Sequence, residues 1–299
     1  MTASTTGAKA DTRPAPPDST SAGRAPRSWK VIAAYAALIL VAVVYIYPFL
    51  IQIATSFKTD ADVTAHPLAL WPTEITTAAF RRLTEVNYSR WFTNSVVVAV
   101  FVTPGRVFFD SLAGYALARL RFRGRSLIFA AVIGVMAVPG VVLLIPRFLV
   151  LNSLGLYDSY TGMILPLMVD AAGVFIMKQF FESIPVSIEE AARIDGAGTF
   201  RIFWSVVLPM ARPALITLTI LSFQGSWNEL AYFIVARQDP DLNTLTTGVG
   251  SLVSGQLGSG SQYPLKLAAA LLMTIPVALV YFAFQRQFVR GAGEGAVKG

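Results

Sequence analysis

Several apolar stretches of about 20 residues or more constrain the fold of this chain more than any other feature. The first runs from Val31 to Ile53 without a charged residue. Such a stretch crosses a bilayer as a helix, because hydrocarbon offers no other partner for the backbone N–H and C=O groups. Charged residues make up only 14% of the sequence, whereas soluble domains carry about 25%. The sequence therefore predicts an all-α, polytopic membrane protein.

We expect about six transmembrane helices. Residues 1–28 are rich in Ala, Pro, Ser, Thr and Gly and are expected to form a disordered tail. Residues 29–92 would hold the first helix and an extracytoplasmic segment, 93–288 the transmembrane core, and 289–299 a C-terminal tail. The predicted spans lie near 30–54, 93–118, 127–150, 161–181, 211–234 and 265–285.

The basic residues predict the orientation in the membrane. Lys and Arg gather on the cytoplasmic side of membrane proteins, and six spans place three basic segments on one side. We therefore expect both termini in the cytoplasm. The basic segments are the N-terminal tail, residues 119–125 and residues 286–298.

Composition and missing motifs exclude several functions. The net charge of +7 does not indicate nucleic-acid binding, because the basic residues flank apolar stretches. The absence of cysteine excludes disulfides and zinc-thiolate sites. The single histidine, His66, is expected to be a solvated loop residue, and no metal site is predicted. Without a G-x4-G-K-[ST] motif the chain has no phosphate-binding loop, so we expect no catalytic residues and no ATP hydrolysis by this chain.

The segment 183–209 between the fourth and fifth spans is expected to form a helix-turn-helix knob outside the membrane. Ser187 and Glu190 have the spacing of a capping box, which predicts a helix from Ile188. Gly196 can adopt the left-handed conformation that ends a helix, and Thr199 can cap a second helix. Ala191 and Ala192 would give the knob a narrow ridge able to enter a groove on another protein.

This segment resembles the EAA loop of ABC-importer permeases. The family pattern E-A-A-x3-G-x9-I-x-L-P is matched at every position except one, where Val206 replaces Ile. The resemblance implies that residues 188–207 form the coupling helix, which docks into a cleft of the ATP-binding subunit. The implied coupling residues are Glu190, Ala191, Ala192, Asp195, Gly196, Leu208 and Pro209.

The resemblance extends from about Thr93 to Gly299 and points to the carbohydrate branch. The segments 113–125, 225–229 and 295–299 are similar to the smaller permease of maltose-type transporters. The resemblance implies the fold of a type I importer permease, a place in the inner membrane of a bacterium, and the import of a di- or oligosaccharide. The implied partners are a second homologous permease, two ATPase subunits that bind ATP and Mg, and an extracytoplasmic sugar-binding protein. Residues 235–264, rich in Gly and Ser, would form a flexible loop that enters the sugar cleft of the binding protein.

Charged residues inside the spans leave alternatives open. Arg106 and Asp110 lie on one helix face. They are expected to neutralise each other against a partner helix or the pore, although an ion-coupled secondary carrier would also use such a pair. Asp170 either lines the pathway or bonds a neighbouring helix. Trp227, Asn228 and Glu229 are either an interfacial anchor or, as the resemblance favours, pathway residues. An importer for a non-sugar solute, such as a polyamine or a phosphodiester, is the alternative within the family.

Overall fold

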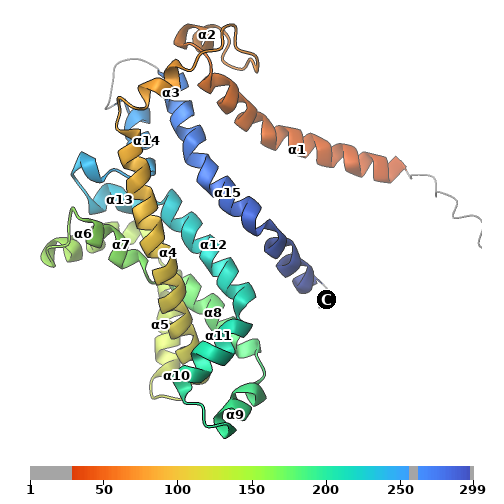
Figure 1. Cartoon of the computed structure of the whole chain (residues 1–299), viewed down its shortest axis with the longest axis vertical. Coiled ribbons are helices and arrows are strands. Elements are labelled where there is room, and N and C mark those ends of the chain that lie inside the picture. Colours follow the sequence, from red (N-terminus) through yellow and green to blue (C-terminus); the bar gives the residue numbers. More distant parts are fainter. Residues whose placement is uncertain (1–28, 256–261, 297–299) are drawn as a thin grey trace, which may run out of the picture. The chain divides into compact units, whose positions relative to one another are not determined.

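The computed structural model describes residues 29–255 and 262–296, with side chains described up to Gln285, and every regular element in these ranges is a helix (Figure 1). The chain divides into two units, Met1–Pro48 and Phe49–Gly299. In the first unit the described part is the beginning of α1 (Trp29–Ser56), whose apolar side chains are exposed. The predicted tail 1–28 lies outside the described residues.

Four helical stretches are long and apolar enough to cross a membrane, which confirms four of the predicted spans. They are α1, α4 (Tyr88–Arg119), the stretch Tyr160–Ser183 and the part of α15 (Tyr263–Ala296) that ends at Gln285. The third is interrupted, since α7 (Tyr160–Ile164) and the short η2 (Leu165–Leu167) precede α8 (Ala171–Ser183).

The other two predicted spans are not straight helices. α5 (Arg125–Met136) is followed by η1 (Gly140–Leu143) and α6 (Leu144–Ser153), with a bend of 101°. Pro139 lies at this bend, and proline cannot donate a helical hydrogen bond. The predicted span 211–234 is likewise divided, because α12 (Arg212–Asn228) ends before α13 (Ala231–Ala236). The second bent pair consists of Thr199–Met210 and Arg212–Trp227, so the described residues hold up to six candidate spans if each bent pair counts as one.

Within residues 49–299, α4 is the central helix, and α8 and α12 pack along it (Figure 1). Small residues permit the close approach of α4 to α8. A Cβ on Gly114 would lie 2.7 Å from the side chain of Met177 and 2.9 Å from the backbone nitrogen of Lys178. Next to this contact, Tyr115, Phe181 and Phe203 form a buried aromatic cluster.

At the other end of α4, the helices α2 (Asp60–Ala65), α3 (Ala78–Arg82) and α14 (Leu245–Val253) pack with α4 and α15. The prediction of a flexible loop over 235–264 is wrong for α14. Thr244 and Thr247 form a capping box, and Leu245 and Leu252 are buried in the core with Trp91. Residues 256–261 lie outside the described part of the chain.

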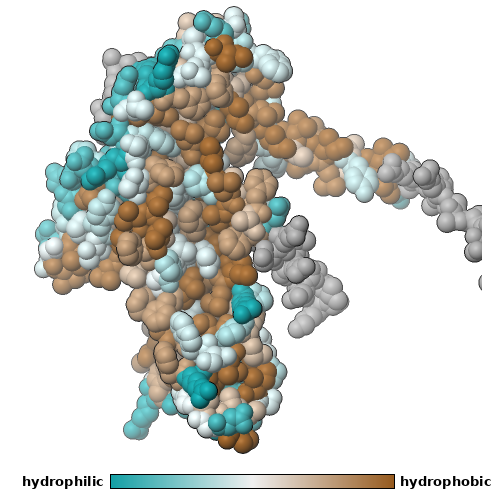
Figure 2. Space-filling model, in the orientation of Figure 1, coloured by the Kyte–Doolittle hydropathy of each residue, from teal (hydrophilic) through white to brown (hydrophobic). Residues whose placement is uncertain are grey.

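The surface of this unit has the polarity of a membrane protein. Figure 2 shows apolar side chains over much of this face of the unit, with polar side chains gathered at its upper left and along its left edge. Leu127, Val141 and Ile145 are 75%, 69% and 71% exposed. Exposed apolar surface of this extent needs lipid or another membrane subunit to cover it.

Candidate functional site

The predicted helix-turn-helix knob is present. It consists of α9 (Val186–Ile194), a turn at Gly196, α10 (Thr199–Ile202), the π-helical turn η3 (Phe203–Val207) and α11 (Leu208–Met210). Gly196 has φ of +80°, which confirms the left-handed conformation predicted for it. A bend of 82° separates the stretch Thr199–Met210 from α12.

The predicted caps of the knob helices are wrong. α9 begins at Val186, after Pro185 in an extended conformation, and has no side-chain cap. Because Pro185 starts the helix two residues earlier than predicted, Ser187 lies inside it and cannot cap it, and Ser187 and Glu190 form no capping box. Gly198 precedes α10, so Thr199 is already the first helical residue.

One face of the knob is exposed. Glu190, Ala191 and Asp195 are exposed, and Ile194 is 86% and Phe200 69% exposed. Ala192 is instead half-buried against the cluster around Tyr115 and Phe181. Of the two alanines in the predicted ridge, only Ala191 is therefore exposed, one turn before Ile194 on α9.

The buried residue of α9 is Glu189, which the sequence did not single out because the adjacent Glu190 carries the family motif. Its Oε1 lies 2.9 Å from Nε of Arg119 at the end of α4, and the two side chains are 2% and 8% exposed. Tyr115 donates its hydroxyl to Oε2 over 3.2 Å, and Arg193 lies 3.6 Å from the same oxygen. Arg119 also donates to the carbonyls of Phe181 and Ile184.

A charged hollow of about 590 Å³ lies beside the knob. Most of the ionisable side chains that line it are basic, and two carboxylates stand among them. Its charged residues are Arg119, Arg121, Arg125, Arg193, Glu189 and Glu190.

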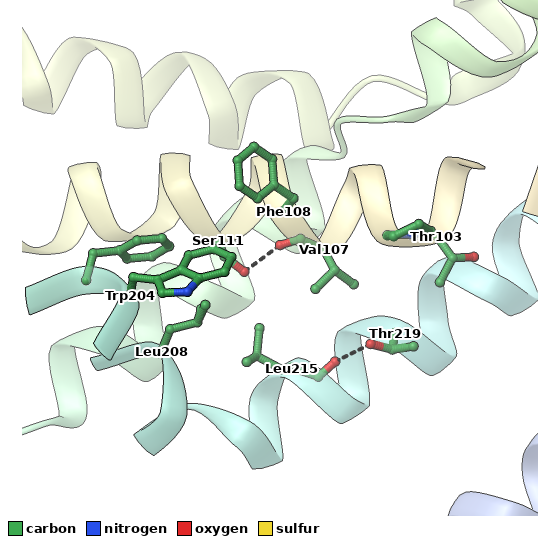
Figure 3. A pocket seen from close by; sticks show the side chains of 10 residues that line it. Thr103, Val107, Phe108, Ser111, Trp204, Leu208, Leu215 and Thr219 are labelled. Atoms are coloured by element: carbon green, nitrogen blue, oxygen red, sulfur yellow. Dashed lines mark hydrogen bonds between the residues drawn. The ribbon is translucent and has the colours of Figure 1, made fainter. Parts of the chain in front are cut away.

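Leu208 lines an apolar hollow of about 410 Å³ between α4 and α12 (Figure 3), and Pro209 is exposed. The hydroxyls of Ser111 and Thr219 at this hollow donate to carbonyls one turn earlier in their own helices, over 2.5 and 2.7 Å. The buried hydroxyl of Thr103, which also lines the hollow, has no hydrogen-bond partner among the described residues, and most of the remaining lining is apolar.

A separate polar pocket of about 210 Å³ is lined by residues of α4, α6, α12 and the interruption before α8. Two arginines and two carboxylates line it: Arg106, Arg147, Asp170 and Glu229. Among the described side chains, these four form no ion pair with one another. Such a pocket presents both guanidinium donors and carboxylate acceptors, which suit a polyhydroxylated solute.

The two carboxylates of this pocket also begin helices. Asp170 was predicted in the middle of a helix but precedes α8, where its Oδ2 accepts from the backbone N–H of Gly173 over 3.2 Å. Glu229 accepts in the same way from the N–H of Tyr232 in α13 over 2.9 Å. Both side chains are therefore fixed in position where a helix is interrupted.

Arg106 and Asp110 contact the interruption before α8 and not each other. Arg106 donates Nε to the carbonyl of Leu167 over 2.9 Å, and the buried Asp110 accepts from the N–H of Asp170 over 3.0 Å. The prediction of a mutually neutralising pair is therefore wrong, although Asp110 does face a neighbouring helix. Gly173 leaves the space for its carboxylate, since an added Cβ would lie 2.8 Å from Cγ of Asp110.

The remaining predicted residues divide between core and surface. Trp227 is buried, packs on Phe223 and donates to the carbonyl of Met273 over 3.1 Å, so it is a core residue and does not line the polar pocket. Asn228 is exposed at the end of α12. His66 is 61% exposed, with Nδ1 3.3 Å from Oδ1 of Asp62.

Comparisons with known proteins agree with this architecture. Residues 110–293 match the model of the family described as binding-protein-dependent transport system inner membrane component. The chain is 32% identical to the arabinooligosaccharides transport system permease protein AraQ of Halalkalibacterium halodurans, over 91% of this chain and 97% of that protein. It is 37% identical to the sn-glycerol-3-phosphate transport system permease protein UgpE of Yersinia enterocolitica, over 66% and 70%.

A solved structure has a similar fold. The crystal structure of a bacterial ABC transporter involved in the import of the acidic polysaccharide alginate contains a chain that matches with a TM-score of 0.77 and 27% identity. The match covers 88% of this chain and 99% of that one.

Proposed function

Because the chain belongs to the family of binding-protein-dependent transport system inner membrane components, we propose that it is a permease subunit of an ATP-driven importer of di- or oligosaccharides. It is not an enzyme. Its relatives include transport proteins for arabinooligosaccharides and for alginate. The polar pocket of Arg106, Arg147, Asp170 and Glu229 supports this solute class, because hydroxyl groups both donate and accept hydrogen bonds.

The exposed face of the knob is the observation that carries the coupling role. Ile194 of α9, a helix that belongs to none of the candidate spans, and Phe200 at the start of α10 are large, exposed apolar side chains. Glu190 and Ala191 of α9 are exposed as well. This face docks into a cleft of the ATPase subunit, and Gly196 and Asp195 shape the turn that presents it. Leu208 and Pro209 join the knob to α12.

The complete transporter contains a second homologous permease, two ATPase subunits that bind ATP and Mg, and an extracytoplasmic sugar-binding protein. Both termini and the knob lie in the cytoplasm. The basic residues Arg121, Arg123 and Arg201 near the knob support this orientation. Closure of the ATPase dimer moves the knob, and the spans reorient around a pathway lined by Asp170, Glu229 and, at its end, Asn228.

Uptake by the reconstituted transporter tests the solute class. Proteoliposomes that contain this chain, its partner permease, the ATPase and the binding protein should accumulate a labelled oligosaccharide when ATP is enclosed with the ATPase. A panel of arabino-oligosaccharides, alginate oligosaccharides and sn-glycerol 3-phosphate separates the sugar from the non-sugar solute. Saturable uptake of glycerol 3-phosphate alone would contradict the proposal, and uptake driven by an ion gradient without ATP would instead favour a secondary carrier.

A further inference from the structure

We infer that the buried ion pair of Glu189 and Arg119 transmits the movement of the knob to α4, and through α4 to the polar pocket. This inference rests on the proposed coupling function, and it adds Glu189, a residue outside the family motif, to the residues that serve that function. Glu189 is a positioning residue here, because it faces the interior while its neighbour Glu190 faces outward.

The covalent connections of the knob are poorly suited to transmit force. On one side, Ile184 and Pro185 are extended, with ψ of 132° and 131°, between α8 and α9. On the other side, the helix is interrupted at Ala211, where the chain bends by 82° into α12. Neither connection is a continuous helix, so the knob needs a non-covalent attachment to move a span in a defined direction.

Arg119 provides such an attachment. Its guanidinium lies 2.9 Å from Glu189 of α9 and donates to the carbonyls of Phe181 and Ile184 at the end of α8. One side chain of α4 thus holds both helices that meet at the knob. The Tyr115 hydroxyl, one turn earlier on α4, holds the second oxygen of Glu189. Apolar contacts of Ile188 and Ala192 also join the knob to this cluster. The ion pair adds an attraction between two buried opposite charges, although its Nε–Oε1 contact does not have hydrogen-bond geometry.

α4 connects this attachment to the polar pocket. Arg106, which lines the pocket, lies on the same helix as Arg119. Thirteen residues separate them, about 20 Å at 1.5 Å per residue. Because α4 is a continuous helix over this distance, a displacement applied at Arg119 moves Arg106 and its contact to Leu167 as well. The ion pair therefore couples the docking site to the interruption before α8.

The chain offers a matched control for this inference. Glu182 is also a carboxylate at this end of the unit and also makes ion pairs, with Lys178 at 2.7 Å and Arg125 at 3.6 Å. Its side chain is 36% exposed, however, whereas that of Glu189 is 2% exposed. Neither partner of Glu182 belongs to α9, although Lys178 is itself only 9% exposed. Glu182→Gln should therefore leave the attachment of the knob, and the mobility of a label on α9, as in the unmodified chain.

The test combines a local measurement with transport. Since the chain has no cysteine, Ser187→Cys on the exposed surface of α9 can carry a single nitroxide label in a complex whose other subunits are free of reactive cysteine. We expect Glu189→Gln to increase the mobility of this label and to lower uptake per ATP hydrolysed at least tenfold, while the ATPase still co-purifies. Glu189→Asp, which keeps the charge but shortens the side chain, should give an intermediate loss and guards against misfolding of the first variant.

Three results would overturn the inference: unchanged label mobility, unchanged uptake per ATP, or loss of the ATPase subunit from the Glu189 variants. The last result would mean that Glu189 only shapes the docking surface. A separate variant, Glu190→Lys, tests the proposed function itself. If that exposed substitution leaves ATPase binding intact, the knob is not the docking site, whatever the Glu189 variants do.

Discussion

Two glycines fix the backbone at the points on which the account depends. Gly196 turns the chain between α9 and α10 at φ of +80°, where a side chain is strained even though the space is open. Gly173, in the first turn of α8, lies against the carboxylate of Asp110, where a side chain would collide. The first position is limited by backbone conformation and the second by space, so substitutions should fail for different reasons.

At Gly196, an L-residue meets a strain of about 1–2 kcal/mol in the left-handed region. This is too small to unfold the protein but large enough to displace the turn. We expect Gly196→Ala to insert into the membrane normally and to lower co-purification of the ATPase severalfold. Gly198→Ala is the control, because Gly198 has φ of −71° and equally open space. Equal ATPase binding by both variants would show that the left-handed turn is not required.

At Gly173, a methyl group would displace the Asp110 carboxylate from the N–H of Asp170. Leaving a buried polar group unpaired costs about 1–3 kcal/mol. We therefore expect Gly173→Ala to lower the thermal stability of the purified protein by several degrees, with reduced uptake. Combining it with Asp110→Ala should restore part of the stability, because the collision is then removed. A fully stable single variant would contradict the packing described here.

At the scale of helices, apolar length predicted four spans correctly, but it could not predict the interruptions. Pro139 and Gly140 were visible in the sequence, yet nothing in them specifies a bend of 101°. α14 was missed because its Gly- and Thr-rich sequence is typical of loops, and only the packing of Leu245 and Leu252 against Trp91 makes it a helix of the core.

For the candidate site, too, the sequence predicted local features but not contacts between distant residues. Family spacing located the knob, and local rules placed Gly196 correctly, whereas the predicted caps failed because Pro185 starts α9 earlier. Glu189 carries no signal in a single sequence, because its role depends on Arg119, 70 positions away along the chain. Asp170 and Glu229 were named as candidates, but their convergence with Arg106 on one pocket follows only from the tertiary structure.

A pH-dependent contact joins the α6–α7 loop to the segment after α13. The Asp158 carboxylate accepts from the N–H groups of Gln238 and Asp239 over 2.8 and 2.9 Å, and these bonds hold its pKa below the ordinary value. An unfolded aspartate has a pKa of about 3.9. The contact therefore stabilises the segment fully above that pH and is lost as the pH falls through the lower, folded value.

We expect the amide protons of Gln238 and Asp239 to be protected from exchange at pH 6 and to lose this protection progressively below pH of about 4. Exchange rates must be corrected for their intrinsic pH dependence. Asp158→Asn tests the cause, since asparagine tolerates the left-handed conformation of this residue, φ of 56°. Protection that responds to acid equally in both proteins would show that Asp158 is not the titrating group.

At the scale of the whole molecule, the orientation of the knob decides whether it can meet an ATPase. Single cysteines in the cysteine-free chain can report it. Ser187 on α9 and Gln238 after α13 are both exposed. An impermeant thiol reagent applied to intact cells should label Gln238→Cys and not Ser187→Cys, and permeabilised cells should label both. Labelling of Ser187→Cys in intact cells would place the knob on the wrong side for coupling.

The central claim is that this chain, which has no phosphate-binding loop of its own, imports its solute by coupling a separate ATPase to the spans through the knob. ATP hydrolysis by the reconstituted complex, measured with and without the loaded binding protein and together with uptake, tests it most directly. We predict that Glu190→Lys and Gly196→Asp insert normally, but that stimulated hydrolysis and uptake are both at least tenfold lower than in the unmodified complex. If both variants kept full stimulation and full uptake, segment 186–207 would be only a connecting loop and the account would be wrong.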